Sequence, residues 1–221
     1  MVNWILGDLF TKDYGHNGSI KKLWEMRWQM PCTRSVYPFH DGKYEDFLPV
    51  FEHLIAEDIN DPFSDEYTKA FLSTGERLAQ EATSSVASDK DKAIELFKRA
   101  NAVYRLARFP YIGTDLKRQV YETQKKVYLE GAKLWDVPVT EVIIPHKYAA
   151  EGDGLAIPLY QRVPPSASAE NPCPVVLLIT GLDGHRPDNT EVRSFIYLGN
   201  PLTALTAHSR SSQSRVGNRH L

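Results

Sequence analysis

The sequence predicts an α/β protein in which a helical segment, residues 1–137, precedes the first strands of a core, residues 138–190. Two observations indicate this order. Up to about Trp135, apolar residues recur at the three-to-four spacing of amphipathic helices. From about Val139, runs of β-branched residues bounded by turn clusters are typical of strands. Residues 191–221 follow neither pattern, and we expect them to form an irregular tail that is off-frame or disordered.

Three helices are predicted in the first part of the chain. The first begins after Ser19, a favourable N-cap, and ends at Pro31. The second starts at about Glu45. The third covers residues 65–82, where Gly75 is expected to weaken the helix by about 1 kcal/mol relative to alanine.

The two strongest helical patterns follow. Residues 91–109 are preceded by Ser88 or Asp89 as a cap and end before Pro110, and residues 115–135 form a second amphipathic helix. The inner faces of this pair are made by apolar residues at helical spacing, namely Ile94, Phe97, Ala100, Tyr104, Ala107, Leu116, Val120, Val127, Tyr128, Leu134 and Trp135. The five helices are expected to pack as a compact bundle.

Three strands are predicted after the helices. Residues 139–144 and 155–163 are expected to pair as an antiparallel hairpin through the turn cluster 151–154. Pro158 places the second strand near an edge or a bulge, because proline cannot donate a ladder hydrogen bond. Residues 175–180 form a continuous apolar run that suits a strand covered on both faces.

Composition narrows the class of function. The 26 Lys and Arg residues are balanced by 28 Asp and Glu residues and are scattered, so nucleic acid is not an expected partner. No apolar run approaches the roughly 20 residues of a membrane span. We expect a cytoplasmic protein, for which a homodimer is one option. Cys32 and Cys173 lie far apart without a zinc pattern, so they are expected to be reduced thiols. Neither a metal nor a cofactor is expected.

The loop after the third strand is the most informative local feature. In an open α/β sheet, ligands bind beyond the carboxyl ends of the strands, and glycines there let backbone N–H groups approach a developing negative charge. Gly181 and Gly184 fit this description of half of an oxyanion hole, although an ordinary turn fits the local sequence as well. A cation site made by Asp183, Asp188 and Asn189 matches no calcium-loop spacing.

Several long strings, taken in order, carry a resemblance to a known family. They lie at residues 4–8, 35–42, 59–61, 64–68, 103–105, 108–111, 180–184 and 186–189. In these strings the chain resembles the fungal yellowish-green-type hydrolases of pigment and melanin pathways, which shorten an aromatic polyketide precursor. The resemblance implies an α/β-hydrolase fold with a helical N-terminal cap and an aromatic polyketide as the small-molecule substrate. It covers the chain from Trp4 to about Thr190.

The resemblance also implies the chemistry of the site. A backbone N–H of Leu182 or Asp183 is expected to polarise the substrate carbonyl. The catalytic serine of this fold lies on a Gly-x-Ser-x-Gly elbow and is followed along the chain by an acid and a histidine. No such motif occurs in the sequence, so no catalytic residue is assigned and the chain itself is expected to be inactive.

Beyond Thr190 the likeness stops. Residues 191–221 show neither the helix expected after the loop nor a next core strand, and we expect a truncated gene model, with a retained intron or a frame shift as its cause. A sheet that stops at about three strands leaves residues 175–179 with unpaired edges and an uncovered face. Poor solubility is the expected consequence.

Two other groups of residues are candidates for a catalytic role. Ser35, His40 and Asp41 lie close in sequence, but triads are assembled from separate elements, so a local triad is not expected. His146, near the end of the first strand, and His185, in the loop, are nearer to the expected cleft. For each, an ordinary hydrogen-bonded surface histidine is the alternative interpretation.

Aromatic residues on the helices have two possible roles. They could cover a flat substrate, although aromatic residues at helical spacing usually form a core; the set is Trp24, Trp28, Tyr104, Tyr111 and Trp135. A different class of function, a noncatalytic helical interaction module, is possible because residues 91–109 and 115–135 form a helix pair. No 34-residue repeat supports that alternative.

Overall fold

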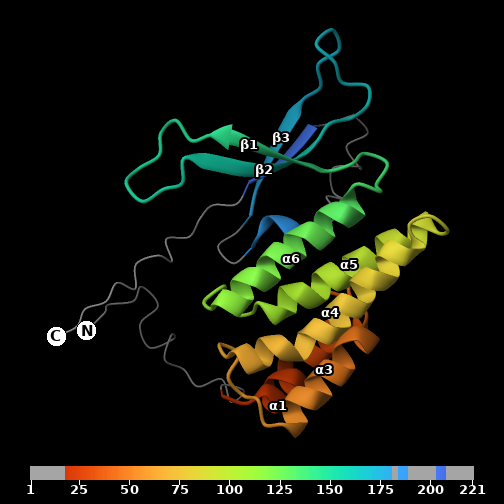
Figure 1. Cartoon of the computed structure of the whole chain (residues 1–221), viewed down its shortest axis with the longest axis vertical. Helices are drawn as coiled ribbons and strands as arrows, with labels where there is room; N and C mark the ends of the chain where they lie inside the picture. Colours follow the sequence, from red (N-terminus) through yellow and green to blue (C-terminus); the bar gives the residue numbers. More distant parts are fainter. Residues whose placement is uncertain (1–17, 181–183, 189–202, 208–221) are drawn as a thin grey trace.

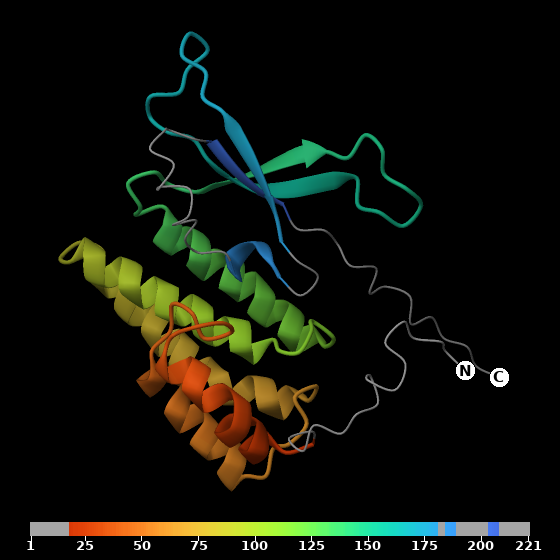
Figure 2. The ribbon, with the colours of Figure 1, turned by 180° about the vertical axis from the view of Figure 1, so that it is seen from behind.

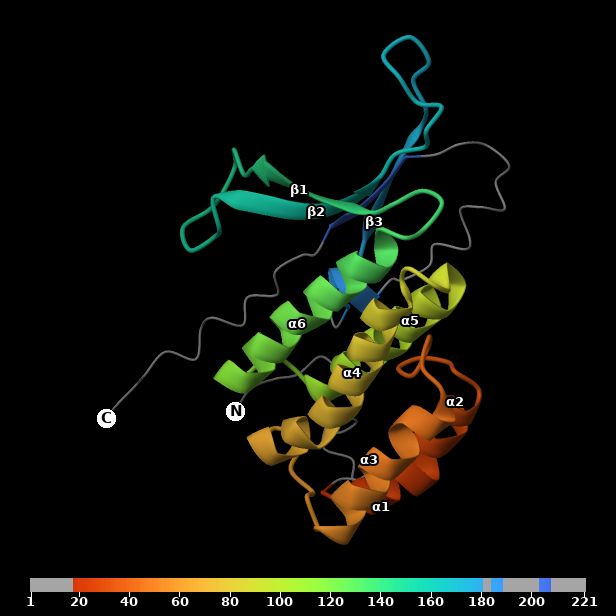
Figure 3. The ribbon, with the colours of Figure 1, turned by 45° about the vertical axis from the view of Figure 1, so that its right-hand side comes forward.

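The computed structural model of the chain describes residues 18–180, 184–188 and 203–207, the last of these as backbone alone. Figure 1 shows a layer of helices beneath a twisted sheet. The helices succeed one another away from the sheet, with α6 (Asp115–Ala132) nearest to it and α5 (Lys90–Ala107) next. The same order is visible from behind in Figure 2 and from the side in Figure 3.

The remaining helices lie on the far side of α5. Their bounds are α1 Ile20–Leu23, a π-helical turn Trp24–Trp28, α2 Gln29–Thr33, α3 Tyr44–Ala56 and α4 Asp65–Ser85. Side-chain oxygens cap four of the helix starts by accepting a backbone N–H three residues on, from Ser19, Ser64, Asp89 and Thr114. Such caps satisfy amide groups that the helix itself leaves unpaired, which explains why the predicted starts are accurate.

The end of the first helical segment differs from the sequence expectation. The first helical segment was expected to end at Pro31, but it continues to Thr33. The π-helical turn just before it replaces the usual ladder with a bond from the Gln29 amide to the Trp24 carbonyl. Pro31 therefore lies at the start of a new α-helical turn, where a missing N–H costs little.

α4 runs through Gly75 without a break, and the expected cost of this glycine relative to alanine stays a prediction. A Cβ atom built at Gly75 would meet the ring of Tyr104 at 2.8 Å. The glycine is thus required by the close approach of α4 to α5.

A cluster of aromatic side chains forms the core of the helical layer. Trp24 stacks on Phe51 with ring centroids 4.2 Å apart, and Phe39 meets the edges of Trp28 and Phe47 at 5.6 and 4.9 Å. All five are buried. Pairs of this geometry stabilise a fold beyond the burial of their apolar area. The prediction that Trp24 and Trp28 belong to the core is confirmed.

Among the described residues, the sheet has four strands in the order β1-β2-β4-β3. Their bounds are β1 Thr140–Pro145, β2 Ala156–Arg162, β3 Val175–Ile179 and β4 Thr203–Ala207. β2 runs antiparallel to both β1 and β4, whereas β3 and β4 are parallel. Pro158 pairs with β1, and the pairing of β2 with β4 begins one residue later at Leu159. β2 is thus an interior strand of the described sheet, and Pro158 lies at the end of its described pairing with β4, so the expected edge or bulge at Pro158 stays a prediction.

β4 corrects the sequence expectation for the end of the chain. An irregular tail was predicted for residues 191–221, but Thr203–Ala207 inserts between β2 and β3. The strand has five residues, and its partners are distant in sequence. Strand formation here depends on cross-strand pairing rather than on local preference, so the local pattern did not reveal it.

The two faces of the sheet have different environments. On the helical side, Tyr160 stacks on Tyr128 of α6 with centroids 5.2 Å apart and ring planes at 8°. The register places Val175, Leu177 and Ile179 on the opposite face, where they are 61%, 56% and 61% exposed. The uncovered apolar face expected for β3 is confirmed, whereas one of its edges is paired, by β4.

None of the helices in the described ranges combines the length and apolar character needed to cross a membrane. Cys32 is a buried free thiol, and burial raises its pKa to about 12.

Candidate functional site

The loop that follows β3 leads from the sheet to the helical layer. The expected oxyanion residues Leu182 and Asp183 lie outside the described residues, but the structure describes both flanks of their segment. On the sheet side, the hydroxyl of Thr180 donates to the carbonyl of Gly184 at 3.0 Å. On the other side, a short 3-10 turn, η3 (Arg186–Asp188), contacts α5 and α6.

Asp188 anchors this turn. Its carboxylate accepts hydrogen bonds from Nη2 of Arg108 at 2.5 and 2.6 Å and from the Gln124 amide at 2.9 Å. Nε of Arg105 lies 3.4 Å away, and the backbone N–H of His185 donates at 2.9 Å. The side chain is almost wholly buried, so these charge-assisted bonds act in a medium where they are strong.

One face of α5 supplies most of the partners. Asn101, Arg105 and Arg108 follow one another at intervals of four and three residues, so they lie on the same side of the helical axis. The Asn101 amide donates to the carbonyl of Pro187 at 2.8 Å, next to the Asp188 contacts. The turn is therefore held at two successive residues by one helix.

His40 completes the arrangement from the N-terminal part of the chain. Its Nδ1 lies 3.1 Å from Nη1 of Arg105, and its Nε2 lies 2.7 Å from the carbonyl of Asp188. A guanidinium can only donate, so Nδ1 accepts and the ring proton is on Nε2, which donates to Asp188. Burial, followed by the charge of Arg105, lowers the pKa of His40. His40 is thus a neutral imidazole of one tautomer.

We call Asp188, Arg105, Arg108, Gln124 and His40 the Asp188 cluster. Burial alone raises the pKa of Asp188, but Arg108 and Arg105 outweigh it and hold that pKa well below its usual range. Burial lowers the pKa of Arg105, which Asp188 and Asp41 oppose. Asp41 lies 4.0 Å from Nη2 of Arg105, so two guanidiniums face two carboxylates. Opposite charges in balance are what a buried ionic group requires.

Four strings that carry the family resemblance meet in this cluster. His40 belongs to residues 35–42, Arg105 to residues 103–105, Arg108 to residues 108–111 and Asp188 to residues 186–189. Arg108 and Asp188 are 80 residues apart in sequence and in direct contact. Strings that looked unrelated along the chain thus form one buried unit.

The local triad is not assembled. The hydroxyl of Ser35 donates to the carbonyl of Gly42 at 2.8 Å, and His40 is engaged by Arg105 and Asp188. These contacts of His40 with Arg105 and Asp188 are a feature that the sequence reasoning missed. The available signal was the placement of Asn101, Arg105 and Arg108 at helical spacing within a stretch of α5 that is otherwise apolar.

The structure separates the two other histidines. His185 lies in the turn, where its ring meets the edge of Tyr121 at 5.0 Å. His146 lies in the β1–β2 hairpin, with Nδ1 3.1 Å from the carbonyl of Gly154. His185 belongs to the site region, whereas His146 is an ordinary hydrogen-bonded histidine.

Among the aromatic candidates, Tyr104 is buried and Tyr111 is 43% exposed beside Phe63. Trp135 packs edge-on against Tyr128 at 5.9 Å. Within the described ranges, no group of three or more His, Cys, Asp or Glu side chains could hold a metal ion. The Asp188 carboxylate, one of the candidate calcium ligands, is bound by Arg108 and Arg105. Asp183 and Asn189 lie outside the described residues.

Comparisons with known proteins bear on the fold. No family model and no curated protein matches the chain. A crystal structure of 2,6-dihydroxy-pseudo-oxynicotine hydrolase is similar with a TM-score of 0.53 and 22% identity, over 76% of this chain and 43% of that chain. A structure described as AbyA5 wild type has a TM-score of 0.47 and 15% identity, over 71% of this chain and 38% of its own.

The chain therefore spans less than half the length of the hydrolase it matches. At this level of identity the likeness concerns the fold alone. The predicted fold class is confirmed: the chain has a partial α/β-hydrolase fold, with a helical cap followed by the first strands of the core.

Proposed function

We propose that the chain is part of a serine-type α/β-hydrolase that cleaves a C–C or acyl bond of an aromatic polyketide in a fungal pigment or melanin pathway. The partial α/β-hydrolase fold supports the hydrolase class. The substrate class rests on the resemblance of the sequence strings.

The observation that carries the proposal is the convergence of four of those strings in the Asp188 cluster. The cluster fixes one flank of the loop after β3, and Thr180 fixes the other through Gly184. These contacts hold the described residues on either side of the loop, and donors that need no rearrangement stabilise a developing oxyanion best. In this proposal, the backbone N–H of Leu182 or Asp183 is such a donor, and Asp188 positions it.

The remaining chemistry requires a catalytic serine, histidine and acid, and none of these is assigned in this sequence. A serine would attack the substrate carbonyl, a histidine would take its proton, and an acid would orient the histidine. The sequence has no Gly-x-Ser-x-Gly elbow, so we infer that the chain alone does not turn over substrate. An oxyanion-hole donor stabilises the transition state of this attack by about 3 kcal/mol. Without the nucleophile there is no attack for it to accelerate.

The alternative of a helical interaction module is less favoured. Every residue from Asn101 to Ala107 of α5 is buried, so this part of the helix pair offers no open face to a partner. Its polar side chains serve contacts within the chain itself.

The proposal is tested with two purified proteins. One is this chain, and the other is a reconstruction in which residues 1–190 are joined to the remaining core of a full-length α/β-hydrolase. Both are incubated with an aromatic polyketide that carries an acyl side chain, and the released fragment is followed by mass spectrometry. We expect no product from the chain and product from the reconstruction.

The matched control is the reconstruction with its elbow serine replaced by alanine, which should be folded and inactive. Turnover by the 221-residue chain would contradict the proposed division of the site. A folded reconstruction that leaves the polyketide intact would contradict the substrate class.

A further inference from the structure

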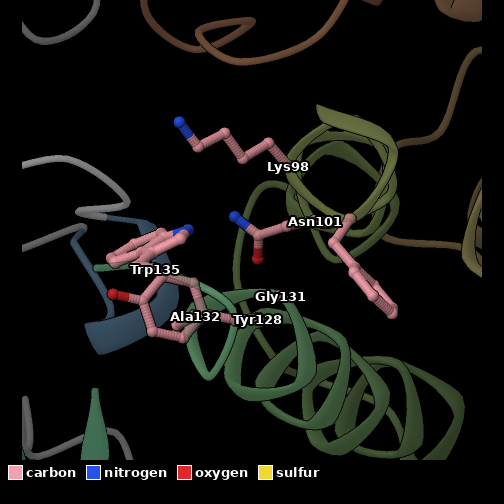
Figure 4. Close-up of a pocket in the computed structure, with 7 residues that line it drawn as sticks. Lys98, Asn101, Tyr128, Gly131, Ala132 and Trp135 are labelled. Atoms are coloured by element: carbon pink, nitrogen blue, oxygen red, sulfur yellow. The ribbon is translucent and has the colours of Figure 1, made fainter. Parts of the chain in front are cut away.

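A small cavity lies between α5 and α6, beside the Asp188 cluster. Its volume is about 10 Å³, and Asn101, Ala132 and Trp135 are among the residues that line it. Figure 4 shows the Asn101 amide among these side chains, with its oxygen directed toward the Gly131 turn of α6. A cavity of this size accommodates one water molecule and nothing larger.

The orientation of the Asn101 amide is fixed by its partner. The carbonyl of Pro187 can only accept, so the atom 2.8 Å from it is the amide nitrogen. The amide oxygen consequently points the other way. Asn101 is fully buried, and this oxygen has no hydrogen-bond donor within the part of the chain that the structure describes. Buried polar atoms in native proteins are nearly always paired, with protein groups or with ordered water.

We propose that one buried water molecule occupies this cavity, donating to Oδ1 of Asn101 and accepting from the indole N–H of Trp135. Figure 4 shows the indole nitrogen on the side of the Trp135 ring that faces Asn101. The water links α5 to the segment that follows α6. It also holds the Asn101 amide in the orientation that binds Pro187, so it belongs to the support of the turn that carries Asp188.

The water can be displaced by a hydroxyl introduced in the same cavity. Ala132 is fully buried and lines the cavity together with Asn101, so Ala132→Ser introduces a hydroxyl group into this cavity. Ala107→Ser is the matched control, because Ala107 is also a fully buried helical alanine but does not line this cavity. Both serines can bond the carbonyl four residues earlier, so that contribution cancels.

Thermal unfolding compares the two variants with the parent chain. We expect the melting temperature of Ala132→Ser to stay within about 2 °C of the parent, and that of Ala107→Ser to fall by on the order of 4–10 °C. A high-resolution crystal structure of the parent should contain a water at about 2.7–3.2 Å from the Asn101 oxygen, and the Ala132→Ser structure should lack it. An empty cavity in the parent, or equal losses in the two variants, would overturn the proposal.

Discussion

Replacing Asp188 with asparagine would leave the shape of the cluster almost unchanged and remove its central charge. Arg105 and Arg108 would then face an amide, and one of its N–H groups would point at a guanidinium that also donates. Two contacts of 2.5 and 2.6 Å to Arg108 lose their ionic character, as does the longer contact to Arg105. Removing one partner of a buried ion pair costs about 3–5 kcal/mol, because the other charge stays buried.

For a chain of this size, about 1 kcal/mol corresponds to roughly 2–4 °C in melting temperature, so we expect Asp188→Asn to lower it by about 6–20 °C. Urea unfolding followed by circular dichroism at pH 7 gives the free energy of unfolding independently. The matched control is Glu81→Gln, which breaks the exposed Arg77–Glu81 pair of 2.9 Å and should cost about 0.5 kcal/mol or less. If Asp188→Asn proved no more costly than Glu81→Gln, the cluster would not anchor the turn.

Three further perturbations test other parts of the structure. Burial and the charge of Arg105 lower the pKa of His40 in the folded chain, so as the pH falls the unfolded chain takes up a proton on His40 before the folded chain does. The free energy of unfolding should therefore fall as the pH drops below about 6.5, and it should fall less in His40→Gln. Gly75→Ala should destabilise by about 1–3 kcal/mol in urea unfolding, because its methyl group meets the Tyr104 ring at 2.8 Å. Lys117→Met should cost about 2–3 kcal/mol in the same assay, because Nζ donates at 2.5 Å to the carbonyls of both Pro62 and Phe109.

Each of these expectations has a contrary result. Identical pH dependence of the parent and His40→Gln between pH 7.5 and 5.5 would show that His40 takes up its proton equally in both states. A gain in stability from Gly75→Ala, as at an exposed helical glycine, would mean that α4 and α5 can separate without cost. Lys69→Met, at an exposed lysine of α4, is the control for Lys117→Met. If both variants lost the same free energy of unfolding, the buried ammonium group of Lys117 would not stabilise the fold.

Sequence reasoning located the helices well because their ends are set by local chemistry. The helix predicted at residues 115–135 is observed as Asp115–Ala132, with Thr114 as its cap, and the helix predicted at 65–82 extends three residues further to Ser85. A cap and an apolar stripe are both readable within a few residues.

The Asp188 cluster could not be predicted in the same way. Asn101, Arg105 and Arg108 lie outside the apolar stripe of α5, and polar residues at helical spacing usually face solvent. They are buried here because a turn more than 75 residues later packs against them. β4 was missed for the same reason, since its partners come from β2 and β3 rather than from neighbouring residues.

The segment from Thr180 to Asp188 begins in the sheet and ends on the helices, and a different contact holds each end. These contacts join the end of β3 to the helical layer. A ligand that moved α5 and α6 away from the strands would have to break the bonds of Asp188 or the bond between Thr180 and Gly184. A change in the packing of α5 and α6 would in this way also change the geometry at the carboxyl end of β3.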